Sequence, residues 1–285
     1  MQGERRIAIC TAPESRLDMK NLRPSELISF VLLSLAICLG GRHELMAQEM
    51  SHMPAFRDRA CVTAEQVVQN LVRMNAERAE ALQAYEGTRV YRLDYRGFPA
   101  SRRAEMVVRV KYRSPLTKDF TVVSATGSKL VIEKVFQKLL QAEKEALRED
   151  HERLSALDSE NYTFKLLGFE PSTPQNDSLY AVSVEPKTKN KFLYRGTIWI
   201  DGKDFAVVRI KAEPAKNPSF WTKHSQIEHE YVKVGDFWLP AHNHSVSTVR
   251  FGGRADLTID YTNYEITDAR PLGAGLHAFA EQLPK

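Results

Sequence analysis

Residues 197–210 read TIWIDGKDFAVVRI, and this stretch decides the fold. Two runs rich in β-branched and aromatic residues, 197–200 and 205–211, flank the polar segment Asp201-Gly202-Lys203-Asp204. Glycine accepts the positive φ that a tight turn requires, so Asp-Gly between such runs predicts a β-hairpin. A hairpin places its strands in an antiparallel sheet.

Similar runs bounded by turn residues continue on both sides of this hairpin. They predict strands at residues 88–95, 105–112, 120–124, 162–169, 179–184 and 226–234. A further hairpin is predicted to turn at Gly252-Gly253.

A two-residue turn at Gly252-Gly253 would pair Val246 with Ile259 and Thr248 with Leu257. The polar residues of both arms would then share the opposite face, namely Asp256, Thr258, Asp260, Ser245 and Ser247. One apolar and one polar face are typical of an antiparallel sheet that is covered on one side only.

One helix precedes this run of strands and a second interrupts it. The first is expected from about Thr63, which can form a capping box with Gln66. The second opens at residues 126–128, and its apolar residues are spaced for one helical face at positions 131, 132, 135, 136, 139 and 140. From Glu143 to Arg153 nearly every residue is charged, so we expect a solvated helix end, with a partner-docking arm as the alternative.

These elements predict an α+β, mainly β fold. We expect a half-open antiparallel β-barrel with the N-terminal helix and the inserted helix packed over or beside its mouth. No internal repeat divides the strands, so residues 61–270 are expected to form one domain, followed by a tail at 271–285.

The N-terminal region contains the one long apolar run, Leu27–Leu39. Its thirteen residues are too few to cross a membrane as a helix but fit the apolar core of a secretory signal. Residues 1–47 are therefore expected to be a signal peptide, with Met19 as an alternative start, and residues 48–60 a short tether. An uncleaved anchor and lipid attachment at Cys38 are the alternatives. We expect export to the periplasm or cell envelope, where Cys61 alone cannot form an internal disulfide.

Composition excludes several classes of protein. The chain has 285 residues, of which 43% are hydrophobic and 27% charged, so it is not disordered throughout. A net charge of +4 is mild for this length and does not predict a nucleic-acid partner.

No catalytic motif is present, so neither an enzyme nor a cofactor is expected. The best metal-binding candidates are His242 and His244, which are two residues apart and share a strand face. A metal-dependent enzyme would need two further ligands from His224, Glu228, His229 and Glu230. We expect these histidines to be structural and no metal site to form.

Aromatic and aliphatic residues on the late strands could either pack the core or line an apolar cavity. The candidates for lining a cavity are Trp199, Trp238, Val246, Leu257, Ile259 and Tyr261. A bent, half-open sheet can hold a hydrophobic ligand of this kind, which requires an apolar cavity of several hundred Å3.

The order of these features resembles that of the outer-membrane lipoprotein-sorting proteins, the LolA/LolB-like family, which is related to the RseB/MucB sensor domains. The resemblance runs from Cys61 to Ile266 and includes the pattern W-I-D-x-x-D-F-x-V-x-R-I at Trp199–Ile210. It implies a half-open barrel that takes up lipoprotein acyl chains or other lipid in the periplasm. In the carriers of this family, the arginine of an Arg-Pro pair contacts the lid, and Arg113 in Arg113-Ser114-Pro115 is its nearest match.

Two functions follow as hypotheses. The first is a periplasmic carrier for outer-membrane lipoprotein sorting, whose partner is a lipid or an acyl chain. The alternative is an envelope sensor or scaffold of the RseB/MucB type, whose partner is an envelope membrane protein.

Overall fold

A computed structural model of the chain describes residues 62–115, 117–146, 156–170, 178–190, 192–216, 222–249 and 252–272. The expected signal peptide, the tether at 48–60 and tail residues 273–285 lie outside this part of the chain.

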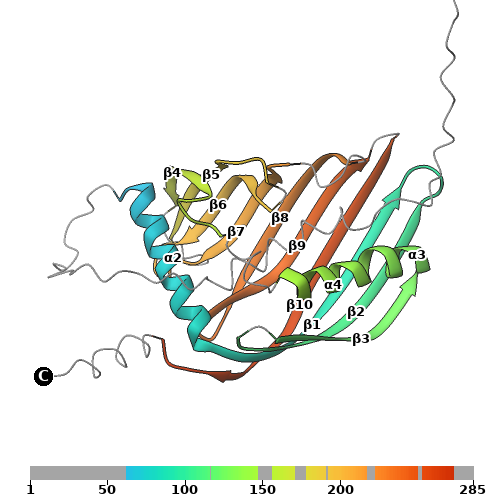
Figure 1. The fold of residues 1–285 in the computed structure, drawn as a ribbon, viewed down its shortest axis with the longest axis horizontal. Coiled ribbons are helices and arrows are strands. Elements are labelled where there is room, and N and C mark those ends of the chain that lie inside the picture. The colour runs from blue at the N-terminus through green and yellow to red at the C-terminus, as the bar shows by residue number, and fades with distance from the viewer. Residues whose placement is uncertain are drawn as a thin grey trace, which may run out of the picture.

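The described residues form one open antiparallel sheet of ten strands (Figure 1). The strand order is β3-β2-β1-β10-β9-β8-β7-β6-β5-β4, so β3 and β4 are the two edges and the last strand pairs with the first. The strands are β1 (Leu82–Arg96), β2 (Arg102–Arg113), β3 (Thr117–Gly127), β4 (Tyr162–Glu170), β5 (Leu179–Pro186), β6 (Tyr194–Asp201), β7 (Val207–Pro214), β8 (Thr222–Val234), β9 (Phe237–Val249) and β10 (Gly253–Ala269).

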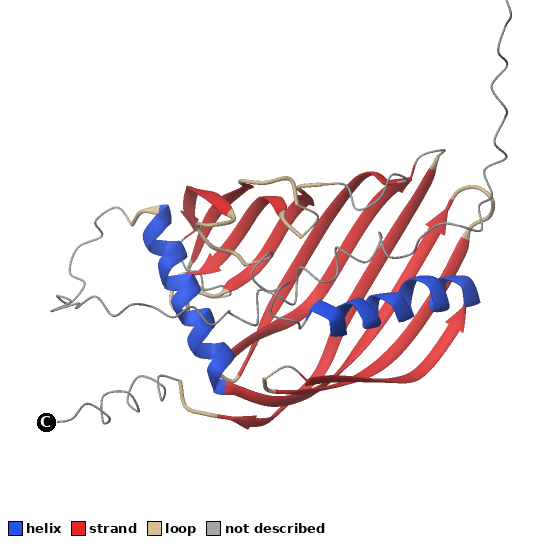
Figure 2. Cartoon of the chain, in the orientation of Figure 1, coloured by secondary structure: helices blue, strands red, loops and turns tan. Residues whose placement is uncertain are grey.

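Two helical segments cover the same face of this sheet (Figure 2). The first is α2 (Ala64–Ala81), which begins at the expected capping box of Thr63 and Gln66. The second is a continuous run of α3 (Lys129–Val131), the π-helical η4 (Ile132–Phe136) and α4 (Gln137–Ala146). We call the helix-covered face the inner face and the opposite one the outer face.

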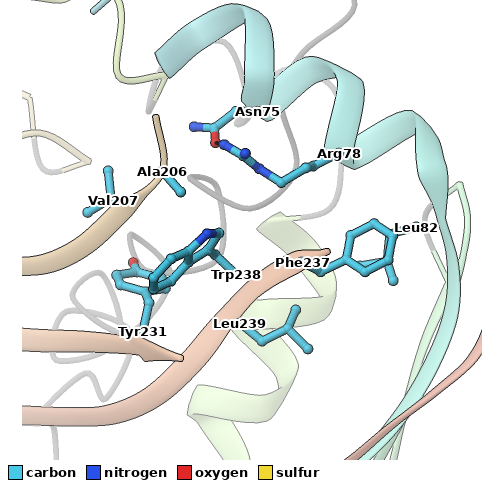
Figure 3. Close-up of a pocket in the computed structure, with 9 residues that line it drawn as sticks. All are labelled: Asn75, Arg78, Leu82, Ala206, Val207, Tyr231, Phe237, Trp238 and Leu239. Carbon is cyan, nitrogen blue, oxygen red and sulfur yellow. Dashed lines mark hydrogen bonds between the residues drawn. The ribbon is translucent and has the colours of Figure 1, made fainter. Parts of the chain in front are cut away.

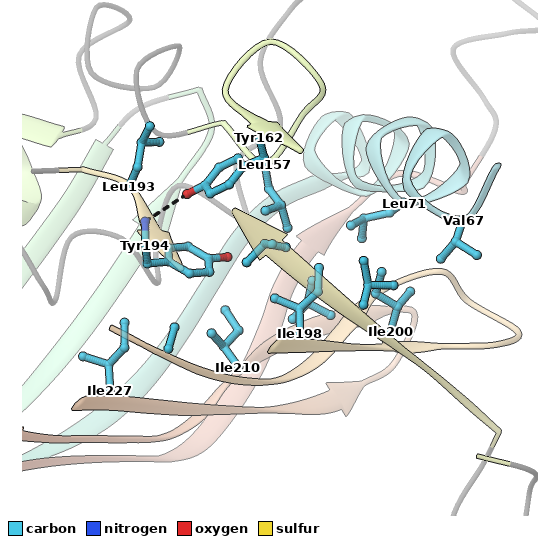
Figure 4. Packing of buried hydrophobic residues seen from close by; sticks show 14 of the residues in the cluster. Val67, Leu71, Leu157, Tyr162, Leu193, Tyr194, Ile198, Ile200, Ile210 and Ile227 are labelled. Atoms are coloured by element: carbon cyan, nitrogen blue, oxygen red, sulfur yellow. Dashed lines mark hydrogen bonds between the residues drawn. The ribbon is translucent and has the colours of Figure 1, made fainter. Parts of the chain in front are cut away.

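The core on the inner face is divided between the two helical segments. Val67 and Leu71 of α2 pack on strands β4–β8, including Ile198 and Ile200 (Figure 4). Phe136 and Leu139 of the second helical segment pack on β1, β2 and β10, whose residues in this cluster include Tyr91, Met106 and Ile259. A smaller cluster joins the end of α2 to β1, β2 and β9; it contains Ala81, Leu82, Tyr85, Tyr112, Phe237 and Leu239.

The predicted fold class is therefore confirmed: the protein is mainly β, with one open antiparallel sheet, an N-terminal helix and an inserted helix. Helix and strand periodicities were sufficient for this, because each element buries one face only.

The register predicted for the β9–β10 hairpin is wrong. Val249 pairs with Gly253, so three residues and not two separate the strands, and Val246 pairs with Asp256 instead of Ile259. The pairing differs from the predicted one by an odd number of residues, which exchanges the faces of one strand relative to the other. Asp256 and Asp260 consequently share the outer face with Val246 and His242.

The β6–β7 hairpin is confirmed, but Gly202 serves another purpose than the expected one. The positive φ in this turn, 48°, belongs to Phe205, whose N–H donates to the Asp201 carbonyl (3.0 Å). A Cβ at Gly202 would lie 2.5 Å from Ser178 Oγ, and the Gly202 N–H donates to the Ser178 carbonyl (2.7 Å). The glycine is needed here for close backbone approach.

Candidate functional site

A strip of the inner face on β8, β9 and β10 lies between the two helix-covered clusters and contains a small open cavity. The space within this cavity is about 230 Å3, counting the part that is open to solvent. Its lining residues are Ile227, His229, Asn243, His244, Ser245, Leu257 and Ile259. The strip thus combines aliphatic side chains with an imidazole, an amide and a hydroxyl group.

Polar side chains connect this strip to the second helical segment. Asn243 is the cross-strand neighbour of His229, and its Nδ2 donates to the Tyr261 hydroxyl (2.7 Å). The guanidinium carbon of Arg89 in turn lies 4.9 Å from the Tyr261 ring centre. This arrangement is a cation–π contact in a buried setting, where such contacts are strongest.

Arg89 belongs to a buried group of three charges that attaches α4 to the sheet. Glu143 of α4 accepts from Arg89 Nη1 (2.7 Å) and from Lys118 Nζ of β3 (3.0 Å). The side chains of Arg89, Lys118 and Glu143 are only 4%, 2% and 1% exposed. Burial alone would raise the pKa of Glu143, but the charges of Arg89 and Lys118 lower it to about 2.

This arrangement corrects the expected solvated helix end at its first residue. Glu143 faces the sheet, because Arg89 and Lys118 supply opposite charge on the inner face. The sequence did contain a signal for Arg89. It is spaced by two and four residues from the apolar Tyr91 and Leu93, so the three residues share the buried face of β1.

A second arginine attaches α2 to the sheet. Arg78 Nη1 donates to the Asp204 carbonyl (2.9 Å) and Nη2 donates to the Phe205 carbonyl (3.0 Å), both in the β6–β7 turn. The Asp204 side chain accepts from Trp238 Nε1 (2.9 Å). Each helical segment is thus held to the sheet by polar contacts of a buried arginine, in addition to its apolar packing.

A recess lies beside Arg78 and contains space of about 410 Å3, counting its solvent-open part (Figure 3). It is lined by Asn75, Arg78, Leu82, Ala206, Val207, Tyr231, Phe237, Trp238 and Leu239. Neither this recess nor the cavity on β8–β10 is enclosed.

The residues predicted to line a cavity lie in the cavity on β8–β10, in the recess beside α2 and on the outer face. Leu257 and Ile259 line the cavity on β8–β10, and Tyr261 is buried on the same face. Trp238 lines the recess beside α2.

Trp199 and Val246 lie on the outer face, which corrects their expected place in the interior. Trp199 Nε1 donates to Glu170 (3.0 Å), and the guanidinium carbon of Arg209 lies 4.0 Å from its ring centre. Val246 is on the outer face because of the changed β9–β10 register, since it pairs there with Asp256.

Arg113, the candidate for contacting the lid, is exposed at the end of β2, next to the buried Tyr112. Strand alternation therefore directs Arg113 to the outer face, away from α4. The arginine that contacts a helix from this half of the sheet is Arg89 of β1.

The side chains of His242 and His244 each lie beside an outer-face aspartate, although His244 is also one of the residues that line the cavity on β8–β10. His242 Nδ1 is 2.7 Å from Asp260 Oδ1, and His244 Nε2 is 2.9 Å from Asp256 Oδ1. Among the described residues no group of three or more histidine, cysteine, aspartate or glutamate side chains could hold a metal ion. His229, one of the possible further ligands, lies on the inner face.

The sequence pointed to His229 only as a possible further metal ligand and did not place it in an inner-face cavity. Its side chain lines the cavity, the residue is 4% exposed, and Nδ1 has no hydrogen-bond partner in the described part of the chain. Burial, and then the charge of His242, lowers the pKa of His229 to about 4, so the imidazole is neutral at physiological pH. Alternation with Glu228 and Glu230 was the available signal for its inward direction.

In the described residues, no helix is long and apolar enough to cross a membrane. Comparison with known proteins found no matching family model, and no curated protein matched the sequence.

Solved structures of lipoprotein-sorting proteins are among those similar to this chain. An outer membrane lipoprotein-sorting protein domain from Vibrio parahaemolyticus is 12% identical, with 72% of this chain and 93% of that chain covered and a TM-score of 0.37. A DUF1329 family protein from Desulfovibrio piger is 13% identical, with the same coverage and TM-score. A LolA superfamily protein from Nitrosomonas europaea is 7% identical over 73% of this chain and 95% of that chain, with a TM-score of 0.32.

The families expected from the sequence pattern are thus found among the structural neighbours, since MucB chains also match. Likeness at these identities concerns the fold alone.

Proposed function

We propose that this chain is a non-enzymatic carrier of the periplasm or cell envelope that binds acyl chains of lipoproteins, or other lipid, on its inner face. In this role it would serve outer-membrane lipoprotein sorting. The proposal rests on the inner face itself, which is apolar over both halves of the sheet and is covered by two separate helical segments.

The observation that carries the proposal is the division of the core into two helix-covered clusters with the cavity strip of β8–β10 between them. A helix that moves away from the sheet would expose apolar side chains of both surfaces, including Phe136, Leu139 and Met106. Burial of an acyl chain there would compensate, at about 0.8 kcal/mol per buried CH2 group.

The size of the cavities determines how a ligand would enter. The two spaces, about 410 and 230 Å3 counting their solvent-open parts, are not enclosed, and neither holds a whole acyl chain as it stands. A whole acyl chain therefore requires one helix to move, and the arginine contacts of α2 and α4 are the polar attachments that would have to break.

Mass spectrometry of lipid extracted from the purified chain beginning at Gln48 tests the proposal. We expect co-purifying acyl lipid, and saturable displacement of a fluorescent fatty acid from the protein. Leu257→Gln, on the inner face, is expected to weaken this binding roughly tenfold, because it places an amide among the apolar contacts.

Val246→Gln is the matched control, because Val246 is also half-buried but lies on the outer face of the neighbouring strand. Its binding should equal that of the unmodified chain. The absence of both extracted lipid and saturable probe binding would contradict the carrier function.

An envelope sensor or scaffold is the second candidate, and edge strand β3 favours it. Val122 and Val123 of this strand are 47% and 57% exposed, and an unpaired edge can accept a strand from a partner. Crosslinking in membranes of the source organism distinguishes the two candidates. A stable stoichiometric membrane partner, lost in Val122→Lys/Val123→Lys, would favour the sensor, whereas transient lipoprotein cargo would favour the carrier.

A further inference from the structure

The inner face contains an imidazole nitrogen that the packing of the sheet leaves without a hydrogen-bond partner. His229 Nδ1 is buried, and no described group bonds to it. Leaving a buried polar atom without a hydrogen bond destabilises the folded state, so such an atom calls for an explanation. Its position in the wall of the cavity on β8–β10 suggests a ligand.

The surroundings of His229 indicate the kind of ligand group. Asn243 and Ser245 add an amide and a hydroxyl to the same cavity, and Ile227, Leu257 and Ile259 surround them with aliphatic surface. The buried guanidinium of Arg89, which contacts the Tyr261 ring, is already paired with Glu143. A charged carboxylate or phosphate would therefore find no free counter-charge among the described cavity-lining residues, whereas an uncharged acceptor needs only a donor.

We propose that His229 Nδ1 donates a hydrogen bond to the uncharged carbonyl of an ester- or amide-linked acyl chain, and that this cavity is the polar end of the lipid site. The inference rests on the proposed carrier function and specifies which part of the ligand lies on β8–β10. The carbonyl would lie at His229, and the chain would extend over Ile227, Leu257 and Ile259, which line the same cavity.

Four probes with the same chain length test the proposal by competition with a fluorescent fatty acid: methyl palmitate, N-methyl palmitamide, palmitate and hexadecane. We expect the ester and the amide to bind about tenfold more tightly than hexadecane, as one net hydrogen bond predicts, and palmitate to gain no such advantage. The ester represents an ester-linked acyl chain and the amide an N-acylated protein, so the ratio of their affinities shows which linkage the site prefers.

Three variants separate a binding role from a structural one. His229→Phe should abolish the preference for ester and amide over hexadecane, whereas His229→Asn, which keeps an N–H near the position of Nδ1, should retain most of it. His242→Phe, on the outer face, should leave the preference unchanged. In the unmodified protein, the 15N resonance of His229 Nδ1 should shift with methyl palmitate and not with hexadecane, which gives a readout even if His229→Phe fails to fold.

The outcomes distinguish this inference from the proposed function. Equal binding of ester and hexadecane, an unchanged preference in His229→Phe, or an Nδ1 resonance that methyl palmitate does not move would overturn the subsite and leave the carrier function standing. Failure of the unmodified protein to bind any of the four probes would overturn both.

Discussion

At the scale of single residues, the feature with the largest expected energetic consequence is the buried carboxylate of Glu143. Its two oxygens accept from Arg89 and Lys118, so three charges are almost completely removed from water. Removing one member of such a group leaves the remaining charge buried without compensation, which costs more than the intact group contributes.

Glu143→Gln is therefore expected to lower the free energy of unfolding by about 3–5 kcal/mol, because Arg89 and Lys118 would remain buried with no opposite charge. Urea unfolding followed by circular dichroism measures this change. Glu133→Gln is the control on the same helical segment, where the side chain is exposed, and it should change stability by less than about 0.5 kcal/mol. A similar small effect in both variants would show that the three charges do not stabilise the fold.

The same group predicts an acid-sensitive stability. The pKa of Glu143 is about 2 in the folded protein against a reference value of 4.5, so the carboxylate binds a proton more readily in the unfolded chain. Its contribution is complete above pH 4.5 and is lost as the pH falls towards 2. We expect the urea midpoint to fall more steeply in this range for the unmodified protein than for Glu143→Gln. Parallel pH profiles would contradict this origin of the acid sensitivity.

At the scale of elements, Arg78 is expected to control how easily α2 leaves the sheet. Arg78→Met removes the bonds to the Asp204 and Phe205 carbonyls but keeps an aliphatic side chain of similar length. Hydrogen bonds to charged groups contribute about 1.5–3 kcal/mol, so amide exchange in α2 should become at least tenfold faster, while exchange in β1 and β10 stays unchanged.

Arg73→Met provides the comparison, since Arg73 is exposed and its contacts within the described part of the chain are with Glu77 and Asn70 of its own helix. Unchanged exchange of α2 in Arg78→Met would mean that apolar packing alone holds this helix.

The helices and strands also show how much of the structure the sequence could predict. Periodicity located both helices and the strands, since each buries one face, and the Thr63 capping box fixed the start of α2. Which residues of β9 and β10 share a face depends on the length of the turn between them, and the sequence does not specify that length. Val246 was predicted on the wrong face for this reason. Glu143 was misjudged because its partners come from β1 and β3, and a contact between distant segments leaves no local signal.

At the scale of the whole molecule, the two halves of the inner face share one continuous sheet. The pairing of β1 with β10 continues through β9 and β8, and the cluster of Leu82, Phe237 and Leu239 connects the end of α2 to the half that contains α4. Cooperative unfolding of both halves is therefore expected, although the cavity strip between them contains polar groups.

The tryptophans allow this to be measured, because Trp199 lies on β6 and Trp238 packs against the cluster under α2, whereas Glu143 lies in the other half. If the sheet couples the halves, Glu143→Gln should lower the urea midpoint of tryptophan fluorescence as much as that of circular dichroism. A fluorescence midpoint that stays at the unmodified value while the circular dichroism midpoint falls would mean that the α4 half opens alone. A ligand could then enter beneath α4 without disturbing α2, whereas coincident midpoints would make opening of the inner face a property of the whole sheet.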